Sequence, residues 1–109
     1  MANTFKLKTK ANVGVTTVGI YTAPASTTPV VIGITLANTS GSGVNVGVGV
    51  TRAGTTEDVK LLKNAPIPSG SSLEFMAGNK VVLEETDTVT VDSDTNNSVD
   101  AALTIMEIT

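Results

Sequence analysis

Apolar and polar side chains alternate along most of this chain, and that alternation constrains its fold more than any other feature. It is clearest in Val44–Val50, Val89–Val91 and Ala102–Ile108, where apolar residues recur at a spacing of two. A period of two is typical of β-strands that have one buried face and one solvated face. No segment has a helical period, so the chain is predicted to be all-β.

Composition and turn residues extend this prediction to a whole fold. The chain has 15 Val, 6 Ile and 18 Thr among 109 residues, and such β-branched residues favour strands. About eight strands at even spacing predict a single antiparallel β-sandwich of jelly-roll or immunoglobulin-like type. The expected strands are Thr17–Tyr21, Val30–Asn38, Val44–Arg52, Val59–Leu62, Ser71–Met76, Lys80–Leu83, Thr88–Asp92 and Val99–Ile108.

The first residues differ in character from the rest of the chain. Their alternating apolar and basic residues are Phe5, Lys6, Leu7, Lys8 and Lys10. They form either a strand with a lysine face or an arm that orders on contact, and we expect an arm over residues 1–12 before a sandwich domain over 13–109. A basic arm on an otherwise acidic chain favours contact with a neighbouring subunit or a capsid, and a solvated strand face is the alternative.

Two glycines inside a predicted strand mark a second candidate contact. Gly47 and Gly49 leave one face of their strand without side chains, so another backbone or sheet can approach it closely. We therefore consider both to be candidate subunit contacts. The alternative is a tightly packed or bulged strand.

The composition excludes several classes of function. Cys and His are absent, so there is no thiol nucleophile, no thiolate metal site and no histidine base, and we expect no enzyme, catalytic residue, cofactor or metal centre. A net charge of −3 and a pI near 4.7 argue against a nucleic-acid partner. No apolar run resembles a secretory or membrane-spanning segment, so we expect a soluble protein made in the host cytoplasm.

Acidic and amide residues cluster in two predicted turns. Asp92–Asn97 has oxygen-bearing side chains at positions one, three and five of a calcium-type loop, but Asn97 replaces its glycine and Leu103 its bidentate glutamate. A polar turn is favoured, and weak cation binding is left open. Glu84, Glu85 and Asp87 lie in one short segment, which indicates a solvated turn rather than paired catalytic carboxylates.

Three segments and the final strand, taken in order, resemble a family of small β-sandwich virion proteins of tailed bacteriophages. They are Tyr21–Gly41, Pro68–Leu73, Leu83–Val91 and Ile105–Ile108. The resemblance covers residues 17–108. It implies a virion structural protein without enzymatic residues, and among such proteins a capsid decoration (cement) protein fits best.

The resemblance implies a homo-oligomer, expected to be a trimer, on the capsid surface, bridging subunits of the major capsid protein. The chain has only Phe5, Tyr21 and Phe75 as aromatics, so it is expected to bury further surface against copies of itself or a partner. A tail, neck or fibre-associated virion role is the alternative. A carbohydrate-binding module is a further one, with Tyr21 as the only plausible sugar platform.

Overall fold

The computed structural model describes residues 3–52, 57–75 and 80–109, and within these ranges it is built from strands and turns. No helix in the described residues is long and apolar enough to cross a membrane. The all-β prediction is confirmed. The strands are β1 Asn3–Val13, β2 Val18–Thr22, β3 Thr28–Asn38, β4 Val44–Thr51, β5 Asp58–Ile67, β6 Ser72–Phe75, β7 Val81–Val82, β8 Thr88–Ser93 and β9 Val99–Ile108.

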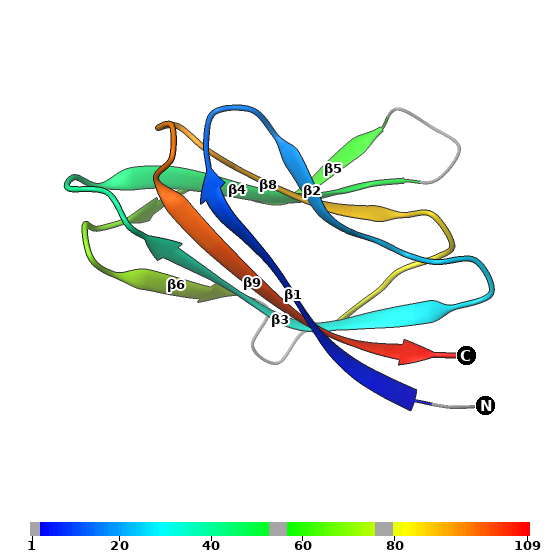
Figure 1. Ribbon diagram of the computed structural model, residues 1–109. Coiled ribbons are helices and arrows are strands. Elements are labelled where there is room, and N and C mark those ends of the chain that lie inside the picture. The colour runs from blue at the N-terminus through cyan, green and yellow to red at the C-terminus, as the bar shows by residue number, and fades with distance from the viewer. Residues whose placement is uncertain (1–2, 53–56, 76–79) are drawn as a thin grey trace.

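The strands form two antiparallel sheets that pack face to face (Figure 1). One sheet has the order β1-β9-β3-β6, with β7 also paired to β3, and the other has the order β2-β8-β4-β5. The first and last strands are neighbours, and most other neighbours in a sheet are distant in sequence, as in a jelly roll. The predicted sandwich is confirmed, and the topology selects the jelly-roll alternative.

The core lies between the sheets and is almost entirely aliphatic. Along β9, Val99, Ala101, Leu103 and Ile105 are buried, while the residues between them face outward, as the period of two requires. The facing sheet contributes buried valines from β4 and β8. Tyr21 is the one aromatic among the buried core residues described.

Residues 3–13 belong to the sandwich, which corrects the expected division between an arm and a domain at residue 12. β1 pairs with β9 from Asn3 opposite Ile108 to Val13 opposite Val99, with a register shift between Lys10 and Val13. The left-handed backbone of Asn12, at φ 59°, lies within this irregularity. The strand alternative therefore describes the segment, because β9 offers it a complete hydrogen-bonding edge.

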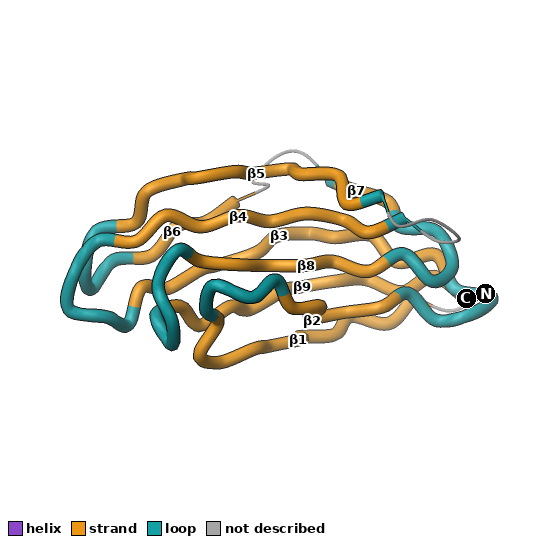
Figure 2. Tube along the Cα trace, turned by 90° about the horizontal axis from the view of Figure 1, so that it is seen from above, coloured by secondary structure: helices purple, strands orange, loops and turns teal. Residues whose placement is uncertain are grey.

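The two sheets leave two long, open edges. Figure 2 shows β1 and β2 along one side of the sandwich and β5 and β7 along the opposite side, with both termini at one end. The molecule measures 45 × 27 × 21 Å along its principal axes. Most of the candidate contact residues predicted from the sequence lie on or near these edges.

Candidate interaction surface

The first strand turns its lysines toward the second sheet and its apolar residues toward solvent. Lys6 is opposite Ile105, which is buried, whereas Phe5 is opposite Met106 and Leu7 is opposite Thr104 on the outer face. Directly opposite residues of an antiparallel pair share a face. Phe5 and Leu7 are therefore 68% and 65% exposed. The first strand has the predicted lysine face, but that face points toward the second sheet, and the apolar face points to solvent.

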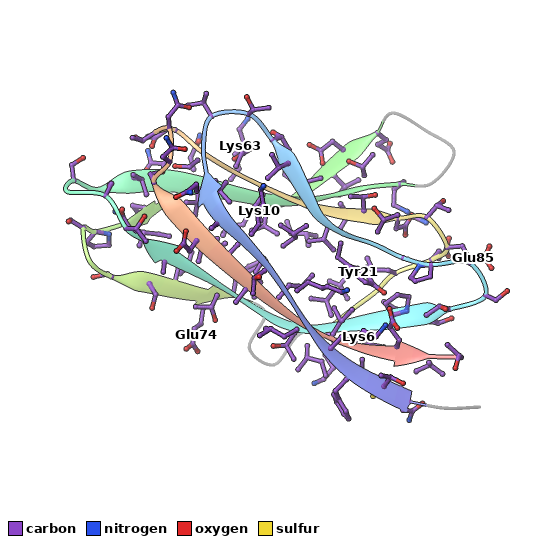
Figure 3. All side chains as sticks on the ribbon, in the orientation of Figure 1. Lys6, Lys10, Tyr21, Lys63, Glu74 and Glu85 are labelled. Carbon is purple, nitrogen blue, oxygen red and sulfur yellow. The ribbon has the colours of Figure 1, made fainter. Side chains whose placement is uncertain are left out.

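The inward lysine face is fixed by a buried glutamate. Nζ of Lys6 lies 2.9 Å from Oε1 of Glu107, and the Tyr21 hydroxyl donates to Oε2 of the same carboxylate at 2.5 Å (Figure 3). These side chains come from β1, β9 and β2, so one carboxylate joins the two sheets. The first strand is thereby oriented with Phe5 outward.

Titration of this group follows from the same contacts. The hydrogen bonds from Tyr21 and Lys6 hold the pKa of Glu107 below its usual range. Burial first, and then the hydrogen bond and the negative charge of Glu107, raise the pKa of Tyr21 above its ordinary value. Glu107 is therefore charged and Tyr21 neutral at physiological pH. Tyr21 is only 7% exposed, so the aromatic on which the carbohydrate-binding alternative depended is not available as a sugar platform.

Phe5 begins a row of apolar side chains that crosses the outer face of its sheet. The register places Phe5 opposite Met106, Met106 opposite Val30, and Val30 opposite Val82, on β1, β9, β3 and β7. We call these four residues the apolar row. None carries a charge, and Val82 at its far end is 60% exposed. An uncharged, partly exposed strip of this kind is a candidate contact surface.

The strand face at Gly47 and Gly49 is not bare, which corrects the premise on which a contact was predicted for these two residues. A Cβ at Gly47 would lie 2.6 Å from Oδ1 of Asp92, and one at Gly49 would lie 2.8 Å from Oδ1 of Asp58. Side chains of neighbouring strands thus fill the space that the glycines leave. The tightly packed, bulged alternative holds, since the β4–β5 register shifts on either side of Val48.

A small charged cluster covers those glycines. Nζ of Lys60 lies 3.0 Å from Oδ2 of Asp58 and 3.3 Å from Oδ2 of Asp92. The hydrogen bond to Asp58 is the largest of the effects that raise the pKa of Lys60. Thr90 is buried beside Gly49, and its Oγ1 has no hydrogen-bond partner among the described residues. Lys60, Asp58 and Asp92 thus occupy the space that Gly47 and Gly49 leave because they have no side chains.

The Asp92–Asn97 segment covers the last two residues of β8 and most of the turn to β9, and side-chain oxygens of the turn accept hydrogen bonds from neighbouring segments. Oδ1 of Asp94 accepts the Asn45 N–H at 3.1 Å, and Oδ1 of Asn96 accepts the Val15 N–H at 3.4 Å. Asn97 adopts φ 52°, which asparagine tolerates in turns. Among the described residues, no three His, Cys, Asp or Glu side chains are grouped so that they could hold a metal ion.

The acidic turn at residues 84–87 is less solvated than expected. Glu84 and Glu85 are exposed, but Asp87 is buried and accepts the Glu84 N–H at 3.0 Å and the Arg52 Nε–H at 3.2 Å. Arg52 also lies 2.9 Å from the Glu84 carboxylate. The sequence around the turn does not predict the ion pair between Arg52 and Asp87, because the two residues are 35 positions apart.

A groove opens between the sheets at the edge formed by β5 and β7. Its volume is about 230 Å³. Its lining is mainly apolar, with Arg52 and two acidic residues completing it. The lining residues are Val50, Arg52, Val59, Leu61, Val81, Val82, Leu83, Glu84 and Asp87. Val59, which faces the space between the sheets, is 41% exposed, so the groove presents apolar surface to solvent.

Comparison with known proteins identifies the fold and no family. No protein-family model and no curated protein matches the sequence. Among solved structures, a chain of Bacillus endospore appendages, described as disulfide-linked pili, matches at a TM-score of 0.61 with 18% identity, over 99% of this chain and 87% of that one.

Viral particles supply further matches. A chain of the T13 IBDV viral particle gives a TM-score of 0.58 at 14% identity over 96% of this chain, which spans only 30% of that larger chain. A chain of the capsid of Helicobacter pylori bacteriophage KHP30 gives 0.54 at 11% identity, over 98% of this chain and 87% of that one. At such identities the likeness establishes a fold that occurs in viral capsids and in pili.

Proposed function

We propose that this protein is a virion structural protein of a tailed bacteriophage, and specifically a capsid decoration protein. It binds the outer surface of the assembled capsid as a homo-oligomer, a trimer, and stabilises contacts between major capsid subunits. The observation that carries the proposal is the apolar row on the outer face of the β1-β9-β3 sheet of this small acidic protein, with Phe5 and Val82 exposed and Met106 and Val30 half-buried. The proposal assigns no catalytic, cofactor or metal role to any residue.

Two further observations support it. The fold occurs in capsid chains, and the KHP30 capsid match covers nearly all of both chains, so that capsid component is about the size of this protein. The resemblance of residues 17–108 to small phage virion proteins points in the same direction. These two observations support the proposal through fold and chain length. The apolar row adds a surface suited to contact with a broad partner such as a capsid shell.

The stabilising mechanism is mass action. A protein that binds the assembled shell, and not free subunits, shifts the equilibrium toward the shell. When the free decoration protein exceeds its Kd about 100-fold, each occupied site contributes about 2.7 kcal/mol against disassembly. Many weak sites therefore reinforce a shell without any chemical step.

Binding to purified capsids tests the proposal. Capsids stripped of this chain should regain thermal resistance when it is added back, and Phe5→Glu should weaken that binding about tenfold or more, because it places a charge in the apolar row. Val15→Glu is the matched control, since Val15 is exposed outside the row. Binding that is unchanged by Phe5→Glu, or no binding to capsids at all, contradicts the proposal.

A filament or tail-associated role is the second candidate function, and the likeness to a pilus chain is the observation that favours it. The disulfide linkage named for those pili has no counterpart here, because this chain has no Cys. Copy number separates the two roles. A decoration protein is present at a number near that of the major capsid protein, whereas a tail or neck component is present in a handful of copies.

A further inference from the structure

The first strand is held in the sandwich by one neighbouring strand. Within the described residues, β1 lies at the end of its sheet and pairs with β9 alone. Figure 1 shows it as the outermost strand beside β9, joined to β2 by a loop at its far end. Of its residues, only Val13 is buried and Lys8 is half-buried. Separating β1 from β9 therefore breaks their ladder and the ion pair of Lys6, but exposes little apolar surface of β1 itself.

The edge of β9 that β1 covers is suited to a strand and to a lysine. The side chain of Glu107 is 8% exposed, and Nζ of Lys6 lies 2.9 Å from its Oε1. Leu103 and Ile105, which lie opposite Lys8 and Lys6, are fully buried. Without a strand at this edge, a buried carboxylate loses its cation and β9 presents a row of unpaired backbone groups. The segment that fits this edge in register is β1 itself.

A hinge lies where β1 meets the rest of the chain. The register of β1 with β9 shifts just before Val13, and within this shift Asn12 has a left-handed backbone at φ 59°. The chain after the hinge is fixed, because the backbone oxygen of Val13 accepts the Ser98 N–H at 3.1 Å and that of Gly14 accepts the Ser93 N–H at 2.9 Å. The strand before Asn12 can therefore turn away from β9 while the following residues stay in place.

We propose that the first strand is exchanged between copies, so that residues 3–11 of one copy pair with β9 of the next copy in the register described above. Lys6 of one copy then lies against Glu107 of the next, and the exchanged strand keeps its contacts. Such an exchange needs no new interface, because the fold already contains it. The inference rests on the homo-oligomer of the proposed function and adds the contact that forms it. In a trimer, each copy passes its strand to the next and the ring closes.

Strand exchange allows a chain with little exposed apolar surface to assemble. The large exposed hydrophobic residues of the described chain are Phe5, Leu7, Val15, Val59 and Val82. Exchange requires no further apolar patch, since its interface is the ladder between β1 and β9. It also places Phe5 of one copy beside Met106 of the next. Two copies then complete each apolar row, so the surface proposed to meet the capsid depends on the oligomer.

Engineered cysteines report which copy supplies the strand, because the chain has no Cys of its own. Thr9 on β1 and Thr35 on β3 both lie directly opposite Ala102 on β9. The variant Thr9→Cys/Ala102→Cys is refolded from urea at low and at high protein concentration and then oxidised. Exchange predicts disulfides between copies, seen as covalent trimers on a non-reducing gel. Thr35→Cys/Ala102→Cys is the matched control, and its disulfide should form within one copy because β3 and β9 stay together.

The hinge gives a second measurement in the Thr9→Cys/Ala102→Cys background. Asn12→Val should raise the ratio of between-copy to within-copy disulfide at least about fivefold over Asn12→Gly. Valine avoids the left-handed backbone that the unexchanged form needs, whereas glycine adopts it freely. Both variants keep the backbone N–H that residue 12 donates to Asp100. Equal ratios would contradict the hinge and with it the exchange.

Two results with the cysteine pairs overturn the proposal. One is a Thr9→Cys/Ala102→Cys disulfide that forms within one copy at every protein concentration. The other is an equal amount of between-copy disulfide in the control, since that would show random collision of copies. If neither variant forms a disulfide, a short bifunctional thiol cross-linker joins the same pairs and gives the same readings.

Analytical ultracentrifugation of the wild type separates this inference from the proposed function. A wild-type trimer whose residues 9 and 102 are linked within one copy overturns the exchange and keeps the homo-oligomer. A covalent dimer as the largest product supports the exchange and contradicts the trimer. No capsid is present in these experiments, so a chain that fails to bind capsids leaves their outcome unchanged.

Discussion

The buried carboxylate of Glu107 lies 2.9 Å from the ammonium group of Lys6, so the last strand of the chain holds the first in a defined orientation. The same carboxylate accepts the hydroxyl of Tyr21 from the opposite sheet. Lys6 therefore points inward and its neighbour Phe5 points outward. The exposed apolar row depends on this arrangement, which makes Glu107 a positioning residue for the proposed contact surface.

Glu107→Ala is expected to destabilise the fold by about 1–3 kcal/mol, because it leaves the buried Tyr21 hydroxyl without its acceptor. Urea unfolding measures the change. Lys6→Met should cost less, because the lysine side chain is 43% exposed and exposed ion pairs contribute about 0–1 kcal/mol. Lys10→Met, on the same strand without an ion pair described for it, is the control. A Glu107→Ala variant as stable as Lys10→Met would contradict the contacts of Glu107.

Acid should weaken the fold in part through Glu107. The pKa of Glu107 is lowered in the folded state. Its contribution to the free energy of unfolding is therefore present above the pKa of an unfolded glutamate, about 4.3, and is lost as the pH falls through the lowered value. Stability curves between neutral pH and strong acid should therefore be flatter for Glu107→Gln than for the wild type. Curves of identical slope would show that Glu107 carries no linked proton.

Alkali should act through Tyr21 with the opposite sign. Its pKa is raised in the folded state, so its contribution is complete below the unfolded value, about 10, and declines as the pH rises above it. Absorbance titration of the phenol should show ionisation of Tyr21 delayed until the protein unfolds. Ionisation at the ordinary pH in a folded chain would contradict its burial against Glu107.

Alanine at Gly49 should destabilise the fold by about 1–3 kcal/mol, since its Cβ would lie 2.9 Å from the backbone oxygen of Val59. Gly47→Ala should cost less, because its closest contact is the side chain of Asp92, which can move. Gly41→Ala is the control, with nothing within 4 Å of the added Cβ. Thermal unfolding ranks the three, and a neutral Gly49→Ala would contradict the tight β4–β5 packing.

Local pattern predicts most of this fold. The strand predicted over Val99–Ile108 has the same bounds in the structure, because its period of two matches a central strand with one buried face. The strand Asp58–Ile67 is longer than its prediction, which ends at Leu62 because Pro66 cannot donate to a ladder. It continues because β5 is an edge strand and because Asn64, at φ 55°, allows the chain to bulge.

Contacts between distant residues account for what the sequence does not predict. The filling of the Gly47 and Gly49 face depends on Asp58 and Asp92 from two other strands. Likewise, the inward direction of Lys6 depends on Glu107, about a hundred residues later, and alternation alone does not say which face of an edge strand is inside. Only the register between β1 and β9 decides that Phe5 and Leu7 are the exposed side.

A cryo-electron microscopy reconstruction of the virion that contains this chain tests the central claim most directly. We predict density for the jelly roll on the outer surface of the capsid, at a copy number near that of the major capsid protein, with the β1-β9-β3 face toward the shell. Density confined to the tail or neck, or a shell without this chain, would contradict a decoration role.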